Sequence, residues 1–395
     1  MSTSAPVALT GHSHGYVAGD SDVPIQTRSE RVRSSDVADF APISRREEQW
    51  KYTTSEQVRG LDADDLTEFL GDIELTGPKN VSTAWVGSDN AAFGAAGTPE
   101  DRPSAAAWGS AEQAYLITLP ANEKLECEAK VTLTSHDTTP SALHLIVEAK
   151  GGSEGTVIVD HRGDAVLAEN LEVLVGDNAH LTVVSIQDFN KGSVHLSSQF
   201  AKLGRNATLK HVVVTLGGDV VRVTPNAVFA APGSSVELLG VYFADAGQHL
   251  EHRLFVDHAQ PNCRSRVTYK GALQGKNAHT IWVGDVLIRA AAEGTDTYEL
   301  NRNLLLTDGA RADSVPNLEI ETGQIEGAGH ASASGRFDDE QLFYLQARGI
   351  DETEARRLVV RGFLNEIIQQ IGNEEVEARL NAAIETELTK TTGSN

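Results

Sequence analysis

The sequence predicts a mainly β protein with a right-handed parallel β-helix (β-solenoid) core, an N-terminal helical or irregular region and a C-terminal helical domain. Three observations lead to this fold class. Residues 114–335 contain many short β-branched segments and no convincing helix of ten residues, which excludes a β-α-β layout. A corner motif recurs within these residues, and amphipathic helical patterns follow them.

The corner motif repeats at a nearly constant spacing. Residues 176–179 (GDNA) recur 28 residues later at 204–207 (GRNA) and, in looser form, after another 29 at 233–236 (GSSV). A fourth copy at 275–278 (GKNA) follows 42 residues on, so we expect an insertion around residues 246–262. Gly and Asn tolerate positive φ at a corner, and one corner and strand per ~28 residues is typical of a solenoid whose coils stack at ~4.8 Å. A β-sandwich is the alternative, but few Asn-Gly or Asp-Gly pairs join these segments as hairpin turns.

The N-terminal segments are less regular. Residues 1–41 are rich in Ser, Ala, Gly and Asp without periodicity, and we expect a flexible tail. Residues 42–113 are expected to be helical or irregular, with a short helix over 61–75 and a loop over 88–111.

The C-terminal residues 336–395 are predicted to form helices. Gly349 ends the first helix in a position that permits the left-handed conformation, and Asp351 caps the second. Asn373 caps the third, and apolar residues recur every three or four positions along the last two. These stripes predict packing between helices, and helices at the end of a solenoid are also a candidate docking surface.

Composition and charge exclude several classes of function. Thirty-three basic against 56 acidic residues give a formal charge of −23 without a basic stripe, which argues against nucleic acid and anionic membrane surfaces as partners. Two distant cysteines encode neither a disulfide framework nor an autonomous zinc site. The chain lacks a secretory signal pattern and any stretch of 18 apolar residues, so we expect a cytoplasmic protein. It also lacks the common nucleotide, hydrolase and zinc-protease motifs, which favours a non-catalytic role.

One group of ligand-type residues lies in the segment 249–263. His249 and His252 are three residues apart, which places them on opposite faces of a strand rather than around one ion. Asp257, His258 and Cys263 follow around a proline-containing turn. A metal site and simple packing roles both stay open here. Other strand histidines are expected to be solvated or hydrogen-bonded spacers, namely His180, His195, His211 and His279.

His330 has a different setting. It lies among small residues in the segment GAGHASASG (327–335), which leaves its imidazole accessible to a partner. A tight metal site needs three or four ligands, so the others would have to come from elsewhere, such as a second chain. On chemistry alone, ligation and corner packing are equally open for this residue.

Four segments resemble the SufB/SufD family of iron–sulfur cluster assembly scaffolds: 45–53 (RREEQWKYT), the stretch around 257–265, 301–323 (NRNLLLTDGARADSVPNLEIETG) and 329–363. The resemblance implies a parallel β-helix core with helical terminal regions. It also implies the SufD type. SufB-like chains carry a Cys and a Glu at the positions that correspond here to Ala310 and Ala331, whereas the motif histidine is retained as His330.

The resemblance implies partners as well. His330 would face the cysteine of a SufB-like paralogue across the subunit interface and contribute to a composite metal site, where the iron–sulfur cluster is assembled and no cofactor is held by this chain alone. The C-terminal helices would dock SufC, an ABC-type ATPase, and a homodimer of the isolated chain is a further expectation. The candidate partner-binding residues are Gln341, Phe343, Tyr344, Arg348 and Phe363.

Two other functions remain as alternatives. A β-helix carbohydrate-active enzyme would need clustered charged residues on one solenoid face, and such enzymes are mostly exported. A self-associating structural β-solenoid would grow end to end, and helices capping its C-terminal end argue against that growth.

Overall fold

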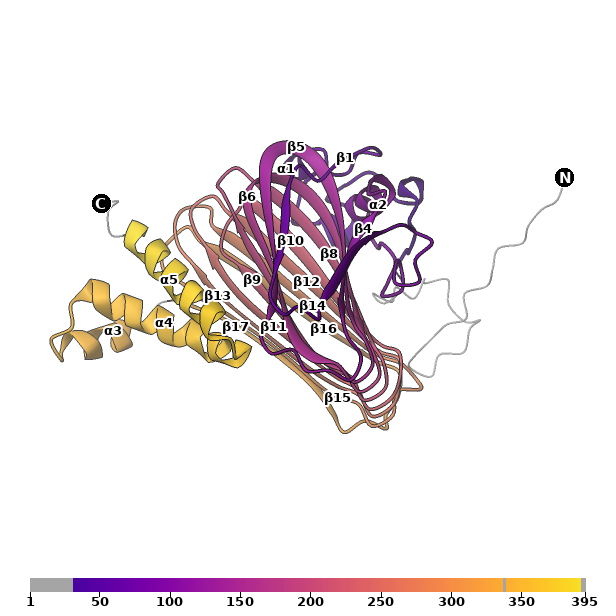
Figure 1. The fold of residues 1–395 in the computed structure, drawn as a ribbon. Helices are drawn as coiled ribbons and strands as arrows, with labels where there is room; N and C mark the ends of the chain where they lie inside the picture. The colour runs from indigo at the N-terminus through magenta and orange to yellow at the C-terminus, as the bar shows by residue number, and fades with distance from the viewer. Residues whose placement is uncertain (1–30, 337–338, 392–395) are drawn as a thin grey trace, which may run out of the picture.

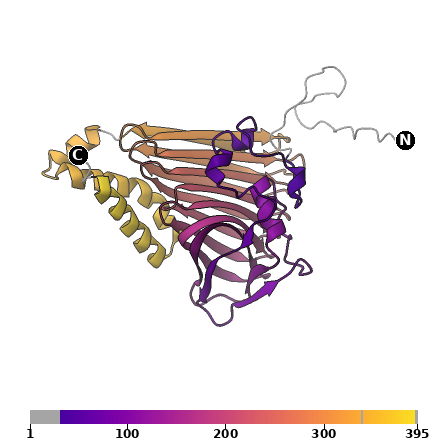
Figure 2. The same ribbon diagram turned by 90° about the horizontal axis from the view of Figure 1, so that it is seen from above.

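The protein is seen here in a computed structural model that describes residues 31–336 and 339–391. A parallel β-solenoid forms the body, and C-terminal helices pack against one side of it (Figure 1). The predicted fold class is thus confirmed. In Figure 2 the coils follow one another from the purple strands at the bottom to the orange strands at the top, and the short N-terminal elements lie on the side opposite the C-terminal helices.

The solenoid has two faces, each of which is a parallel β-sheet. Successive strands of the chain belong to opposite faces. The long strands β5 (Ala129–Ala149) and β6 (Glu154–Val175) contribute to both faces. One face continues with β7 (His180–Phe189), β9 (Thr208–Thr215), β11 (Ser235–Ala244), β13 (Arg264–Leu273), β15 (Asp296–Leu305) and β17 (Gly327–Arg336). The other continues with β8 (Val194–Leu203), β10 (Val220–Phe229), β12 (His249–His258), β14 (His279–Ile288) and β16 (Arg311–Ile320).

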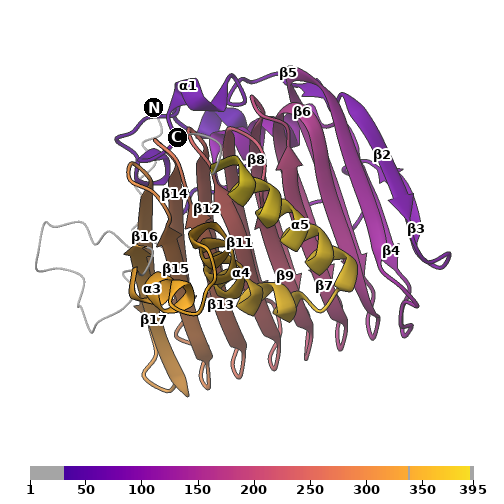
Figure 3. The same ribbon diagram turned by 90° about the vertical axis from the view of Figure 1, so that its left-hand side faces the viewer.

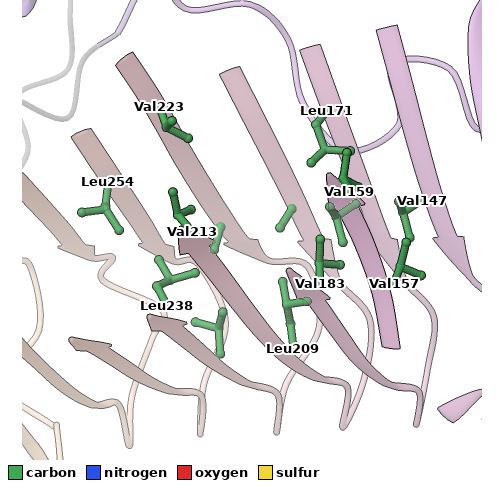
Figure 4. Close-up of a cluster of buried hydrophobic side chains, with 14 of the residues drawn as sticks. Val147, Val157, Val159, Leu171, Val183, Leu209, Val213, Val223, Leu238 and Leu254 are labelled. Atoms are coloured by element: carbon green, nitrogen blue, oxygen red, sulfur yellow. The ribbon is translucent and has the colours of Figure 1, made fainter. Parts of the chain in front are cut away.

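The space between the faces is filled by ladders of aliphatic side chains (Figure 4). Because alternate residues of a strand point to opposite sides, every second residue faces this interior. Two tyrosines fit by lying over glycines of the neighbouring strand. A Cβ on Gly240 would stand 2.1 Å from the ring of Tyr269, and a Cβ on Gly271 would stand 1.8 Å from the ring of Tyr242. The glycines therefore make room for the two largest side chains in their part of the core.

The corners confirm part of the predicted repeat and correct the rest. Asn178 and Asn206 adopt φ of 58° and 51° before β7 and β9, and Gly233 adopts 80° before β11. The fourth copy on this side is Asn262, with φ of 57° before β13, and not the segment 275–278. Residues 275–278 lie at the opposite corner, before β14, so the expected insertion around 246–262 is wrong: those residues form β12 and a corner.

The N-terminal end of the solenoid is capped by strands. β2 (Gly71–Thr76) pairs antiparallel with β5, and β3 (Ser82–Val86) pairs antiparallel with β4 (Ala114–Leu119). A short strand, β1 (Thr67–Glu68), also pairs with β5. The expected helix over 61–75 is therefore wrong, because the alternating Ile73 and Leu75 join the sheet edge. The expected loop over 88–111 instead contains α2 (Arg102–Ser110), which Asp101 caps by accepting a hydrogen bond from Ser104 N.

The rest of the N-terminal region covers the outer side of the face that holds β8 and β10. It contains η1 (Val37–Asp39), η2 (Glu48–Trp50) and α1 (Ser55–Val58). Buried Trp50, Val58 and Leu61 pack there against strand residues. Residues 1–30 of the expected tail lie outside the described residues, and defined contacts begin at Arg31, which forms ion pairs with Glu100 and Asp285.

Three helices follow the last strand: α3 (Asp339–Gln346), α4 (Glu352–Ile371) and α5 (Glu374–Thr391). Asp351 accepts from Glu354 N and Asn373 accepts from Val376 N, so the predicted caps are confirmed. The helices do not cap the end of the solenoid, however. α4 and α5 turn back along the outer side of the face formed by β7, β9, β11 and β13 (Figure 3), and they bury the apolar residues on that side. End-to-end growth is therefore not blocked by helices.

Buried charges fix these helices on the sheet. The ammonium of Lys270 on β13 is almost fully buried, and its partners are the carboxylate of Glu366 and the carbonyl of Phe363 on α4. Arg379 on α5 donates to Asp160 at 2.6 Å and to Asp188 at 2.7 Å, on β6 and β7. A motion of the helices would therefore be transmitted to the strands. None of the helices within the described residues is long and apolar enough to cross a membrane.

Candidate functional site at the open end of the solenoid

The C-terminal end of the solenoid, unlike the N-terminal end, is open. Among the described strands, β16 pairs only with β14, and β17 pairs only with β15. Each last strand thus has one edge on which no described strand pairs with it. The interior residues of the last coil are only half-buried, including Ala312, Leu318 and Ile320. We call this end, formed by β16 and β17, the mouth. An edge of this kind is a template for pairing with another strand.

His330 lies in the middle of β17, at the mouth. Its register partner on β15 is Glu299, whose own partner on β13 is the interior residue Val267. Side chains of paired residues in parallel strands lie on the same side of the sheet, so His330 is on the interior side. It is nevertheless exposed, because no further coil of the described chain covers it. Its neighbours on that side, Ser332 and Ser334, are also exposed and small.

Glu299 lies one coil below His330 and is buried, with 1% of its surface exposed. No described residue hydrogen-bonds to either of its carboxylate oxygens. Burial, with a smaller contribution from the charge of Asp285, raises the pKa of Glu299 to about 8. The indole Nε1 of Trp282 likewise has no hydrogen-bond acceptor among the described residues. Both groups border Gly284, where an added Cβ would stand 2.6 Å from Glu299 Oε1 and 2.5 Å from the Trp282 ring.

A hydrogen-bonded network forms the floor of the mouth beside this pair. The hydroxyl of Tyr242 donates to Asn303 at 2.6 Å and accepts from Asn301 at 2.9 Å. Asn303 also donates to Asn301 and to the hydroxyls of Ser314 and Ser334. These polar groups are therefore already paired, in contrast to Glu299. Sequence reasoning missed the network and Glu299, although polar residues at every second position of β15 were a signal that this strand differs from the apolar coils before it.

The two positions from which the resemblance implied the SufD type are placed differently. Ala310 lies in the turn before β16, half-buried against the interior cluster. Ala331 lies on β17 next to His330, with its side chain on the other side of the strand. His330 is thus the ligand-type residue among these three, and the structure places it at an exposed edge.

The candidate partner-binding residues of the helices fall into three groups. Phe343 and Tyr344 on α3 are exposed by 72% and 56%, and Arg348 lies over the Tyr344 ring at 4.5 Å. Phe363 is half-buried and packs on Lys270 of β13, whose Nζ lies 4.9 Å from the ring centroid. Gln341 lies in α3, but its side chain is outside the described residues.

A second cluster of ligand-type residues is sealed inside the solenoid. Within the described chain, the group of three or more such residues close enough to share an ion is His161, Glu169 and His195. His161 donates from Nε2 to Glu169 and from Nδ1 to the Ile186 carbonyl, and His195 donates from Nε2 to Glu169 at 3.0 Å. Burial opposes ionisation, but the charge and hydrogen bond of Glu169 keep the pKa of His161 raised, and His161 keeps that of Glu169 lowered. We interpret the cluster as a buried ion pair with a neutral second histidine.

The segment 249–263 does not form a metal site among the described residues. His249 bonds to Thr53 outside the solenoid, whereas His252 bonds to Thr215 inside it, so the two histidines do face opposite sides. Of the two alternatives that the sequence left open for this segment, packing roles therefore apply. Its other members have separate partners: Asp257 binds Arg289, His258 bonds to Ser265, and Cys263 is buried at a corner.

The strand histidines match the expectation with one exception. His180 is exposed, His195 bonds to Glu169, and His279 bonds to Asp313 at 2.6 Å. His211 is buried, and neither of its ring nitrogens has a hydrogen-bond partner among the described residues. The expectation of a solvated or bonded spacer is wrong for His211, because the coil before and the coil after it place Val183 and Leu238 against it.

Comparison with known proteins gives a consistent result. Residues 131–363 match the family model described as SUF system FeS cluster assembly, SufBD core domain. The chain is 51% identical over 369 residues to an iron–sulfur cluster assembly SufBD family protein of Mycobacterium tuberculosis, covering 91% of this chain and 93% of the relative. It is 50% identical to one of Mycobacterium leprae with the same coverage. A second SufBD family protein of M. leprae is 26% identical over 60% of this chain and 27% of that relative.

Proposed function

Because the chain belongs to the SufBD family of iron–sulfur cluster assembly proteins, we propose that it is a SufD-type, non-catalytic subunit of a cytoplasmic SufBCD complex. It pairs through the mouth with a SufB-like paralogue and binds the SufC ATPase through its C-terminal helices. His330 contributes to a composite site in which the cluster, the cargo of the complex, is assembled. The observation that carries the proposal is the exposure of His330 at the unpaired end of the solenoid.

The free edges of β16 and β17 support pairing with a second solenoid. Capping strands cover the N-terminal end, whereas the mouth exposes strand edges and half-buried apolar side chains. Natural proteins rarely leave such an edge uncovered. A paralogue is a suitable partner because its last coil has the same strand spacing. The two M. leprae relatives, which match this chain to very different degrees, indicate that members of the family occur together in one organism.

The metal-ligand atoms that this chain offers at the mouth support a composite site. One imidazole cannot hold iron by itself, and Ala310 and Ala331 supply no ligand atom. A cysteine from the paired paralogue provides the thiolate that iron–sulfur clusters require. Cluster assembly at the interface would then depend on both chains.

The exposed aromatic residues of α3 support docking of an ATPase. Phe343 and Tyr344 expose large apolar surfaces next to Arg348, and aromatic residues with arginine are enriched in protein interfaces. α4 is fixed to β13 through Lys270. Movement of a bound ATPase dimer would thus be passed through α4 to the solenoid and towards the mouth.

His330→Ala tests the composite site in the reconstituted complex with the paralogue and the ATPase. We expect normal co-purification of the three chains, because the exposed imidazole makes no contact that folding needs, and loss of cluster assembly measured by the visible absorption of the cluster. His180→Ala, which removes an exposed histidine at the start of β7, is the matched control. Wild-type cluster yield from the His330 variant would overturn the role of this residue.

Tyr344→Glu tests ATPase docking. We expect at least about tenfold weaker binding of the ATPase, measured by titration calorimetry, since an interface aromatic residue typically contributes more than 1 kcal/mol. Trp85→Glu is the control, because Trp85 is 51% exposed but lies on β3 at the capped end. Equal binding by both variants and the wild type would place the docking surface elsewhere.

A chain that forms only homodimers when the paralogue is present would contradict the proposed pairing.

A further inference from the structure

Glu299 is a buried carboxyl group without a hydrogen-bond partner among the described residues. A buried polar group that lacks a hydrogen bond destabilises the folded protein, and most buried polar groups in folded proteins have a partner. The register partner of Glu299 on the preceding coil is Val267 of β13, which offers no polar side-chain atom. The fold therefore keeps, at a cost in stability, a carboxyl group that the described residues do not use.

The strand register places one imidazole directly above this carboxyl group. Glu299 and His330 are paired residues on β15 and β17, on the same side of the sheet. Paired positions on parallel strands are ~4.8 Å apart, which a change of side-chain rotamer can bridge for these two residues. Asn303, another polar residue of the floor, already donates to Ser314 and Ser334.

Gly284 gives the carboxyl group room beside Trp282. A Cβ at this position would stand within 3 Å of both the Glu299 carboxyl group and the indole ring. Asp285, next along β14, points to the outer side and is paired with Arg31, so it does not compete for the imidazole. Beside Gly284, the Glu299 carboxyl group and the Trp282 indole are thus both without a hydrogen-bond partner among the described residues.

We propose that Glu299 is a positioning residue for His330: in the assembled site, one ring N–H of His330 donates a hydrogen bond to the Glu299 carboxyl group, which turns the other nitrogen outwards to bind iron across the interface. This inference rests on the proposed role of His330. A histidine that binds a metal usually donates its other ring N–H to a carboxylate or carbonyl, which fixes the tautomer and the orientation of the ring.

Glu299→Leu separates this role from a structural one. Removal of an unpaired buried carboxyl group should leave the melting temperature unchanged or higher. We expect, in the complex with the paralogue, about 10-fold to 100-fold weaker binding of Co²⁺, used as a spectroscopic substitute for iron. In the same complex, the ¹⁵N shifts of the His330 ring should change from one fixed tautomer to a mixture. Glu299→Gln, which keeps an acceptor oxygen, should retain the single tautomer.

Thr297→Val is the matched control, since Thr297 is the neighbouring interior residue on β15 and bonds to Ser265, away from His330. Unchanged Co²⁺ affinity and ring shifts in Glu299→Leu would overturn the inference. If His330→Ala abolishes cluster assembly while Glu299→Leu does not, the inference fails and the proposed function stands. If both variants assemble clusters like the wild type, the proposed role of His330 fails as well.

Discussion

Replacement of His211 by leucine should stabilise the protein and reduce its sensitivity to acid. His211 lies on β9, on the interior side, between Val183 and Leu238 of the adjacent coils. Neither ring nitrogen has a partner among the described residues, so the neutral imidazole carries an unpaired donor and an unpaired acceptor. Leucine has a similar volume and matches its apolar neighbours. Removal of an unpaired buried polar group stabilises a protein by about 1–3 kcal/mol. We expect the free energy of unfolding to rise by that order at pH 7.5.

The gain should increase as the pH falls. Burial lowers the pKa of His211 from 6.5 to about 4, so below pH 6.5 the unfolded chain takes up a proton that the folded chain does not. The stability associated with the neutral imidazole is complete above pH 6.5 and is lost as the pH falls towards 4. At pH 4.5 this linkage amounts to about 2–3 kcal/mol. The free energy of unfolding of His211→Leu should therefore exceed that of the wild type by about 2–3 kcal/mol more at pH 4.5 than at pH 7.5.

Urea unfolding followed by circular dichroism at pH 7.5, 5.5 and 4.5 measures this difference. His180→Leu, at an exposed position on β7, is the control and should follow the wild type at every pH. His252 and His258 also have a pKa lowered by burial, to about 3, so the wild type and both variants keep part of their acid sensitivity. A pH-independent difference between His211→Leu and the wild type would refute the reasoning.

Three further predictions concern the core and the helices. Glu169→Gln removes the counter-charge of a buried imidazolium and should cost about 3–5 kcal/mol, measured by urea unfolding at pH 7.5. Arg379→Met should release α5 from Asp160, and proteolysis should then cut the C-terminal helices faster while the solenoid resists; equal cutting rates would show that apolar packing alone holds the helix. Gly271→Ala places a methyl group against the ring of Tyr242 and should lower stability by about 1–3 kcal/mol, whereas alanine at the exposed strand residue Gly335, where nothing lies within 4 Å of an added Cβ, should cost less; a smaller loss at 271 than at 335 contradicts the packing account.

The sequence predicted the local features of the fold well. β-branched segments punctuated by Gly and Asn predicted the strands and corners, and Asp351 and Asn373 predicted two helix starts, because propensities and caps act over a few residues. The errors occurred where pairing overrode local preference. Residues 61–75 have helical character in isolation but supply β2 to the open side of β5.

Part of the candidate site could also be predicted from sequence. The small residues around His330 indicated an accessible imidazole, and it is exposed. Glu299 could not be predicted as its neighbour, because the two residues meet only through the register of β15 and β17. The lengths of the intervening β16 and its corners set that register, and no local pattern encodes them.

The sequence by itself determined the strands, the corner residues, the helix starts and the histidine with small neighbours, since each depends on interactions within a few residues. The tertiary structure alone decided that the segment 275–278 lies at the opposite corner, that α4 and α5 lie along a face rather than over the end, and that Glu299 lies below His330. The physical reason is that these relations join residues about one coil or more apart. Their geometry depends on the number of residues in each coil and on the apolar surface left uncovered once the coils have stacked.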